Sequence, residues 1–302
     1  CSLVRGGTMA NRTNILTAIA WASFWSVASP MVGFAQEEPT MISDTVYVIE
    51  LEDNSTLYGY IISRGQDALS IRTIAGLTIE IDAFLVRSIT EASGQLVDGE
   101  YWSEDPNNTR LFFAPTSRPV VNGACYVGTY MIILPFAGCG LGDRFTIAGG
   151  APILFGKLKP FYIAPKLTLL QTENLGLAIG TLAFAGFDDD SDVVGIAFGV
   201  ATFGSSDRAL TTGLGFGYAG SDFASDPVLM LGGETRLSRR VKLVTENYIV
   251  PMGIEVGLFM GGVRILANNF TGDVGILGAI EKRDLACCIP VINFAYRFGG
   301  RG

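Results

Sequence analysis

From Thr109 onward, apolar segments of about ten residues alternate with short stretches of turn-forming residues. Each segment with its connection takes about 16 residues, enough for the roughly 9–11 residues of a membrane-spanning β-strand. The pattern predicts twelve consecutive antiparallel strands over residues 109–298. They are Thr109–Ala114, Ala124–Ala137, Arg144–Leu154, Pro160–Leu170, Leu175–Ala185, Val193–Phe203, Ala209–Ala219, Val228–Leu237, Val241–Val250, Val256–Leu266, Phe270–Ala279 and Ile289–Phe298.

The connections between these segments tend to alternate in length. Tight turns are expected at Gln171–Asn174, Ser238–Arg240 and Ala267–Asn269, and longer loops at Pro115–Gly123 and Gly220–Pro227. Short turns at one end and larger loops at the other are typical of an up-and-down transmembrane barrel. An even number of strands places both ends of the barrel wall on the same side.

Side-chain size alternates along the predicted strands. In Val194–Phe203 and Ala209–Ala219, one face carries large apolar side chains and the other carries Gly and Ala. A soluble sheet would be polar on its second face. We therefore expect the large face to point outward into lipid and the small face to line a narrow lumen. The wall must close on itself, because lipid cannot satisfy a free sheet edge.

The last predicted strand shows a specific pattern. Ile292, Phe294, Tyr296 and Phe298 alternate with smaller or polar residues. With this strand, residues 109–298 resemble bacterial outer-membrane β-barrel proteins, whose last strand alternates in this way and ends in Phe. The resemblance implies outer-membrane lipid and the barrel-assembly machinery as partners, with Phe294, Tyr296 and Phe298 as the assembly signal. The tail, residues 299–302, departs from that pattern by following the Phe.

A small β module precedes the barrel. Residues 45–90 contain five short strand patterns separated by turn signals such as Asp53-Asn54-Ser55. The segment 51–59 resembles the first hairpin of SH3-like or Sm-like barrels. The module is interpreted either as a periplasmic docking or plug element or as a structural appendage. Residues 36–44 and 91–108 are predicted linkers.

The first 35 residues have the layout of an upstream extension followed by a secretory signal peptide. Arg12 precedes the apolar run Ile15–Ala28, and Gly33 and Ala35 precede a predicted cut before Gln36. An uncleaved membrane anchor is the alternative. Export predicts a location in the outer membrane of a Gram-negative cell, with the module in the periplasm.

Composition narrows the function. The formal net charge is −8 and only 17% of the residues are charged, so no nucleic-acid partner is expected. The chain has no His, which excludes Ser-His-Asp and Cys-His catalysis and imidazole-ligated zinc. We therefore expect a protein that is not an enzyme and that has no cofactor and no metal centre.

The charged residues within the strands are expected to point inward, because a basic side chain facing lipid costs about 2–4 kcal/mol near the bilayer midplane. They either form a solute-selective constriction or a structural ion-pair network that plugs a narrow barrel. These predicted lumen charges are Lys166, Glu234, Arg236, Lys242, Glu246, Arg264, Asp273 and Arg297.

Two further features lie near predicted strand ends. Asp188, Asp189, Asp190 and Asp192 form either a divalent-ion loop or an exposed, solvated loop.

Cys125 is predicted at the outer end of the second strand, and Cys287 and Cys288 at the outer start of the twelfth. Closure of the barrel places these ends two strand spacings apart, about 10 Å, so a disulfide from Cys125 to Cys287 or Cys288 is expected. Cys139 is predicted one strand length away from Cys125 and is not expected to pair with it.

The sequence thus predicts an all-β, porin-like protein that acts as a passive pore or a small-solute transporter. The alternative is a structural or anchoring barrel with a sealed lumen, whose periplasmic module docks a partner. A secreted, soluble β-sandwich is a third interpretation.

Overall fold

The computed structural model describes residues 45–92, 94–98, 100–152, 160–186, 192–251, 255–281 and 284–300. The predicted signal peptide, the linker 36–44 and Asp188–Asp190 lie outside the described residues. No helix in the described part of the chain is long and apolar enough to cross a membrane.

The small module is a five-stranded antiparallel sheet in the order β4-β3-β2-β1-β5. Its apolar core is built around Ile49 and Ile71, both fully buried. The five strand patterns expected from the sequence are confirmed, but the predicted linker that follows contains a hairpin of β6 and β7. The elements are β1 (Val46–Leu51), β2 (Thr56–Arg64), β3 (Ala68–Thr73), β4 (Thr78–Asp82), the 3-10 turn η1 (Ala83–Leu85), β5 (Val86–Glu91), β6 (Gly94–Val97) and β7 (Glu100–Ser103).

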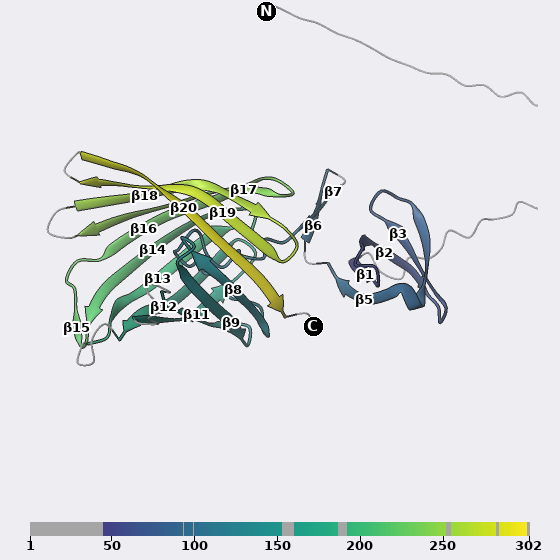
Figure 1. Ribbon diagram of the computed structural model, residues 1–302, viewed down its shortest axis with the longest axis horizontal. Coiled ribbons are helices and arrows are strands. Elements are labelled where there is room, and N and C mark those ends of the chain that lie inside the picture. The colour runs from purple at the N-terminus through teal and green to yellow at the C-terminus, as the bar shows by residue number, and fades with distance from the viewer. Residues whose placement is uncertain are drawn as a thin grey trace, which may run out of the picture. The chain divides into compact units, whose positions relative to one another are not determined.

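The larger part of the chain is a closed ring of twelve antiparallel strands (Figure 1). Each strand pairs with the next along the chain, and β20 pairs with β8 to close the ring. The two-residue β15 (Asp222–Phe223) extends β14 outside the ring. The wall strands are β8 (Ala124–Tyr130), β9 (Leu134–Leu141), β10 (Phe145–Gly150), β11 (Phe161–Gln171), β12 (Leu175–Ala185), β13 (Val194–Gly204), β14 (Arg208–Ala219), β16 (Val228–Ser238), β17 (Val241–Pro251), β18 (Glu255–Leu266), β19 (Phe270–Glu281) and β20 (Asp284–Gly299).

Both ends of the wall lie at the same end of the barrel, where Ala124 pairs with Gly299. We call this the terminal end and the opposite one the far end. Every connection at the terminal end has two or three residues, whereas three far-end connections, at 151–160, 186–193 and 220–227, are longer. The predicted asymmetry of turns and loops is therefore confirmed at these three connections, whereas the other three at the far end are as short as those at the terminal end.

The number of wall strands is confirmed, but two predicted strands were wrong. Residues 109–114 are not a wall strand, and residues 124–137 are not one strand but the hairpin of β8 and β9. The chain reverses at Met131 and Ile132, which adopt positive φ angles of 48° and 68°. Neither is a residue that normally marks such a reversal, so the apolar stretch resembled one continuous strand. The two errors cancelled in the count.

The outer face of the wall is apolar, with side chains such as Ile179, Leu231 and Ile265 about half exposed. On β14 the large side chains Leu210 and Leu214 point outward, as expected. On β13 the expectation was wrong, because its large side chains point into the lumen and its Gly and Ala residues point outward. Alternation alone cannot distinguish inside from outside when both faces are apolar.

Candidate functional site: a plugged lumen

The interior of the barrel is occupied by the chain that precedes the wall. Every residue from Asp105 to Val120 is buried or half-buried, and we call this segment the lumen plug. It turns back on itself, with Leu111 N donating to Ala114 O and Thr116 N donating to Thr109 O, each at 2.9 Å. These residues were predicted as a linker end, a first strand and an outer loop, and the structure corrects all three.

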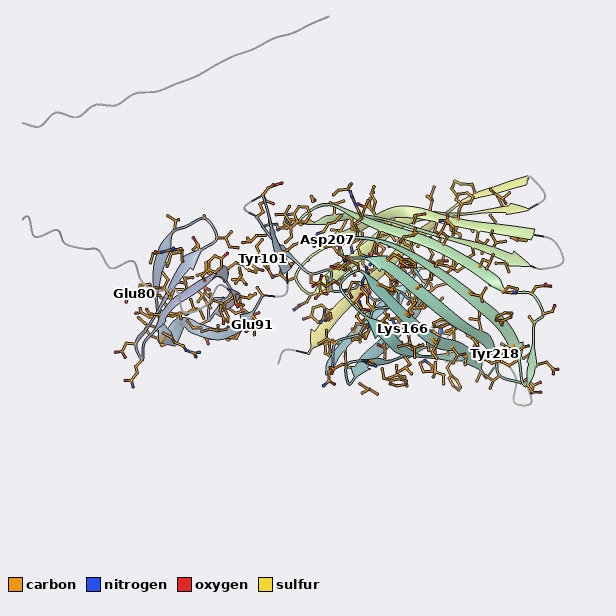
Figure 2. All side chains as sticks on the ribbon, turned by 180° about the vertical axis from the view of Figure 1, so that it is seen from behind. Glu80, Glu91, Tyr101, Lys166, Asp207 and Tyr218 are labelled. Carbon is orange, nitrogen blue, oxygen red and sulfur yellow. A yellow bond between two sulfur atoms is a disulfide. The ribbon has the colours of Figure 1, made fainter. Side chains whose placement is uncertain are left out.

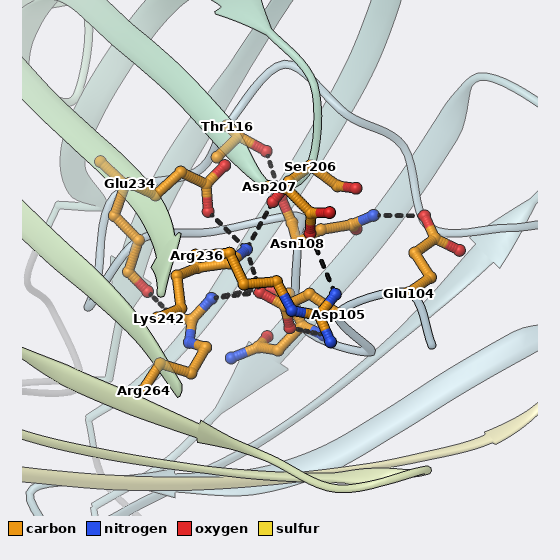
Figure 3. A network of polar contacts seen from close by, with 12 residues as sticks. Glu104, Asp105, Asn108, Thr116, Ser206, Asp207, Glu234, Arg236, Lys242 and Arg264 are labelled. Carbon is orange, nitrogen blue, oxygen red and sulfur yellow. Dashed lines mark hydrogen bonds and ion pairs between the residues drawn. The ribbon is translucent and has the colours of Figure 1, made fainter. Parts of the chain in front are cut away.

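Six charged side chains connect the plug to the wall in one alternating chain. Figure 3 labels four of them, which are Asp105, Glu234, Lys242 and Arg264. The plug supplies Asp105 and Arg118, and the wall supplies the other four. Lys242 Nζ lies 2.6 Å from Asp105 Oδ2 and 3.0 Å from a carboxylate oxygen of Glu234. The full order is Arg118–Glu234–Lys242–Asp105–Arg264–Asp273, with three charges of each sign.

The side chains of these ion pairs are almost completely shielded from solvent. Asp105, Lys242 and Arg264 are each 0% exposed. Burial by itself would raise the pKa of Asp105, but Lys242 and Arg264 lower it well below the usual value of 3.8. Breaking a buried pair on one side costs about 3–5 kcal/mol, because it leaves an uncompensated charge. The plug is therefore held in place by ion pairs whose disruption would leave a charge buried and unpaired.

Two other predicted lumen charges bind the backbone of the plug. Glu246 Oε2 accepts from the N–H groups of Phe113 and Ala114 at 3.0 and 3.1 Å. Lys166 Nζ donates to the carbonyl oxygens of Thr116 and Arg118 at 2.8 and 2.6 Å. Lys166 lies among the side chains of the barrel in Figure 2. An irregular segment inside a barrel needs such partners, because buried backbone groups must be hydrogen-bonded.

Uncharged inward side chains complete this binding, and the sequence analysis missed them. Thr202 accepts from Ser117 N at 3.0 Å, and Thr168 donates to Ser117 O at 2.8 Å. Asn293 donates to Phe112 O at 3.2 Å. The sequence signal for these three residues was a polar side chain at an inward position of an otherwise apolar strand. The prediction of lumen residues considered only charged side chains at such positions.

Glycines on the wall make room for the plug. A Cβ at Gly232 would overlap the side chain of Leu111, and a Cβ at Gly176 would overlap Ser117. Leu111 and Phe112 are 0% exposed and belong to the apolar cluster at the centre of the barrel. The inner face of the wall therefore matches the plug in shape as well as in charge.

An apolar cavity of about 610 Å³ lies against the plug. Its lining includes Phe136, Leu182, Phe184, Ile196 and Phe198 from the wall. We call it the lumen cavity. The large inward side chains of β12 and β13 thus line a space, and on β13 this orientation is the opposite of the expected one.

A closed ring of twelve antiparallel strands with an apolar outer face and short turns at one end combines the features of a transmembrane wall. The chain has the architecture of the outer-membrane β-barrel superfamily. No individual family is assigned: no protein-family model matches the chain, and no curated protein matches it.

Solved structures similar to this barrel include two of the outer-membrane protein OmpT of Vibrio cholerae. The in-vitro folded trimer form is 11% identical with a TM-score of 0.33, and the match covers 84% of this chain and 96% of that one. The outer-membrane expressed form is 10% identical with a TM-score of 0.32, covering 84% and 94%. Scores this low do not establish a common fold, so the architecture rests on the ring of strands.

The remaining predicted residues of the barrel lie as follows. Arg236 is bound to Asp207 at 3.0 Å in the neighbouring terminal-end turn, outside the alternating chain. Arg297 is half-buried at the terminal end and opposes the rise that burial causes in the pKa of Glu104. Phe294, Tyr296 and Phe298 are partly exposed on the outer face of β20. Asp192 is exposed.

The predicted disulfide was wrong. Cys125 faces Cys139 across the β8–β9 hairpin and is bonded to it, with Cα atoms 4.1 Å apart. Cys125 pairs in register with Phe298, ten residues beyond Cys288 along β20, which is a separation of about 33 Å. Cys287 is bonded instead to its neighbour Cys288. The error followed from treating the hairpin as one strand, which placed Cys125 at the wrong end of the barrel.

Proposed function

We propose that this protein is an outer-membrane barrel whose lumen is sealed by its own chain, so that it is not a passive pore in its resting state. The observation that carries the proposal is the alternating chain of six buried charges that joins Asp105 and Arg118 of the plug to the wall. A water-filled pore would leave its lumen charges solvated, whereas Lys242 and Arg264 are each 0% exposed.

The proposal favours the sealed-lumen alternative of the sequence analysis over the open pore. The barrel is oriented in the outer membrane with its terminal end toward the periplasm. The small β module then lies in the periplasm, where it is available to dock a periplasmic partner. Outer-membrane lipid surrounds the wall, and the barrel-assembly machinery recognises Phe294, Tyr296 and Phe298. No catalytic role is assigned to the lumen charges, because they are engaged in holding the plug.

Conductance across planar bilayers tests the seal. Folded full-length protein is expected to give no channel events. A variant lacking residues 106–119 is expected to conduct, provided that its heat-modifiable migration on a detergent gel shows a folded barrel. Arg240→Ala, which removes one exposed charge at a terminal-end turn, is the control and should be silent. Frequent, stable openings of the unmodified protein would show that the lumen is an open pore.

A further inference from the structure

The lumen cavity contains an unusual charged group. Arg110, on the plug, is 4% exposed and lines the cavity. Its Nη1 lies 3.2 Å from Tyr130 Oη, but its Nε and Nη2 atoms have no hydrogen-bond partner among the described residues. The buried hydroxyl of Tyr162, which lines the same cavity, also has no partner there.

Aromatic rings surround this guanidinium group. Its Cζ lies 3.9 Å from the centre of the Phe136 ring, 4.9 Å from that of Tyr130 and 5.4 Å from that of Tyr126. Cation–π contacts of this kind offset part of the cost of removing a cation from water. They do not satisfy its N–H groups, and a buried polar group without a partner is expensive.

The charged side chains that line the cavity are all basic among the described residues. Among the described residues that line it, the charged ones are Arg110 and Lys166, and none is a carboxylate. Lys166 already donates to carbonyl oxygens of the plug. Arg110 is therefore the cation that is left to pair with a negatively charged group entering the cavity.

We propose that the lumen cavity binds an amphiphile with one apolar chain and an anionic head group, whose head pairs with Arg110. The planar guanidinium group presents two N–H groups side by side and matches a carboxylate or a phosphate. The rest of the ligand lies along the apolar wall of the cavity, whose volume of about 610 Å³ is within the usual range for small-molecule sites. This inference rests on the proposed function, because the plug supplies Arg110.

The cavity lies next to the part of the barrel wall that has the shortest strands. The strands β8, β9 and β10 have 7, 8 and 6 residues, whereas their neighbours β11 and β20 have 11 and 16. In Figure 1 the yellow β20 extends well beyond the dark teal β8 and β9. Ile133 and Leu134, at the far end of this part of the wall, line the cavity. A lipid-soluble ligand thus meets apolar lining at the rim of the barrel.

Competition measured by native mass spectrometry tests this ligand class. Full-length protein in detergent is mixed with equal concentrations of palmitate, hexadecyl phosphate and hexadecanol, which share one tail length and differ in the head. One of the two anions is expected to be bound at least tenfold more than the neutral alcohol, and the preferred anion identifies the head group. Equal binding of all three probes, or binding of none, would overturn the proposal.

Two variants separate the head site from the tail site. Arg110→Gln should reduce the preference for the anion to near unity. Ala164→Trp, at a cavity-lining position, should weaken binding of all probes at least tenfold. Arg240→Gln is the matched control and should bind as the unmodified protein does. Anion binding that is unchanged by Ala164→Trp would place the ligand outside the cavity. Conductance of the same samples reports the seal separately, so a silent barrel that binds no anion contradicts only this inference.

Discussion

The charge chain between plug and wall is tested most directly by Lys242→Ala. Lys242 is fully buried and contacts Asp105 at 2.6 Å, Glu234 at 3.0 Å and the carbonyl oxygen of Ser206 at 2.6 Å. The substitution removes the central cation of the chain. Two buried carboxylates are then left with one cationic partner each, Asp105 with Arg264 and Glu234 with Arg118.

The expected cost to the plugged state is about 3 kcal/mol. This value is the lower end of the roughly 3–5 kcal/mol found when a buried ion pair loses one member, because each carboxylate keeps another cation. At about 1.4 kcal/mol for each factor of ten, the equilibrium between plugged and unplugged barrel shifts by about two powers of ten. The twelve-stranded wall should stay folded, because its strands remain paired.

Single-channel recording in planar bilayers measures this shift. Lys242→Ala is expected to give channel events at least tenfold more often than the unmodified protein. Arg240→Ala removes a charge of the same sign at an exposed turn and should change nothing. The double variant Asp105→Asn/Lys242→Met removes one charge of each sign and leaves the pairs Arg118–Glu234 and Arg264–Asp273.

Replacing both members of a buried pair by neutral groups is often close to neutral in free energy, so the double variant should be nearly silent. The reasoning is refuted if Lys242→Ala, with its barrel shown to be folded, opens no more often than Arg240→Ala. It is also refuted if the double variant opens as often as the single one, since the unpaired charge would then not be the cause.

Three further predictions concern the same barrel. Gly232→Leu should displace Leu111 of the plug and raise limited proteolysis of the plug several-fold, and an unchanged cleavage rate would contradict this close contact. Non-reducing mass mapping should recover Cys125 joined to Cys139, and recovery of Cys125 as a free thiol would reject that pairing. Because the pKa of Asp105 is lowered from 3.8, its stabilisation of the plug is complete above about pH 4 and is lost only as the pH falls through the lowered folded value. Lowering the pH from about 8 to about 5 should therefore leave Asp105 ionised. Openings that this pH change adds to the unmodified protein but not to Asp105→Asn would contradict the sign of the shift.

Much of the wall followed from local pattern. The spacing of apolar segments predicted the strands from β11 to β19 to within a few residues, because strand alternation and turn residues act between neighbours in sequence. The inward position of Glu234, Lys242 and Arg264 followed from the cost of placing a charge in lipid. The hairpin at Met131 and Ile132 was missed because its residues carry no turn signal.

The sequence by itself determined the wall strands from β11 to β19, an apolar outer wall and an interior that holds the charged residues. Only the tertiary structure decided what those charges bind. The partner of Lys242 at Asp105 is 137 residues away and lies in a segment whose own pattern resembled a linker. Such a pairing depends on closure of the ring, which brings distant inward positions around one axis. The same closure decided which apolar face of β13 points inward, because the burial of a face depends on the neighbouring strands and not on the strand itself.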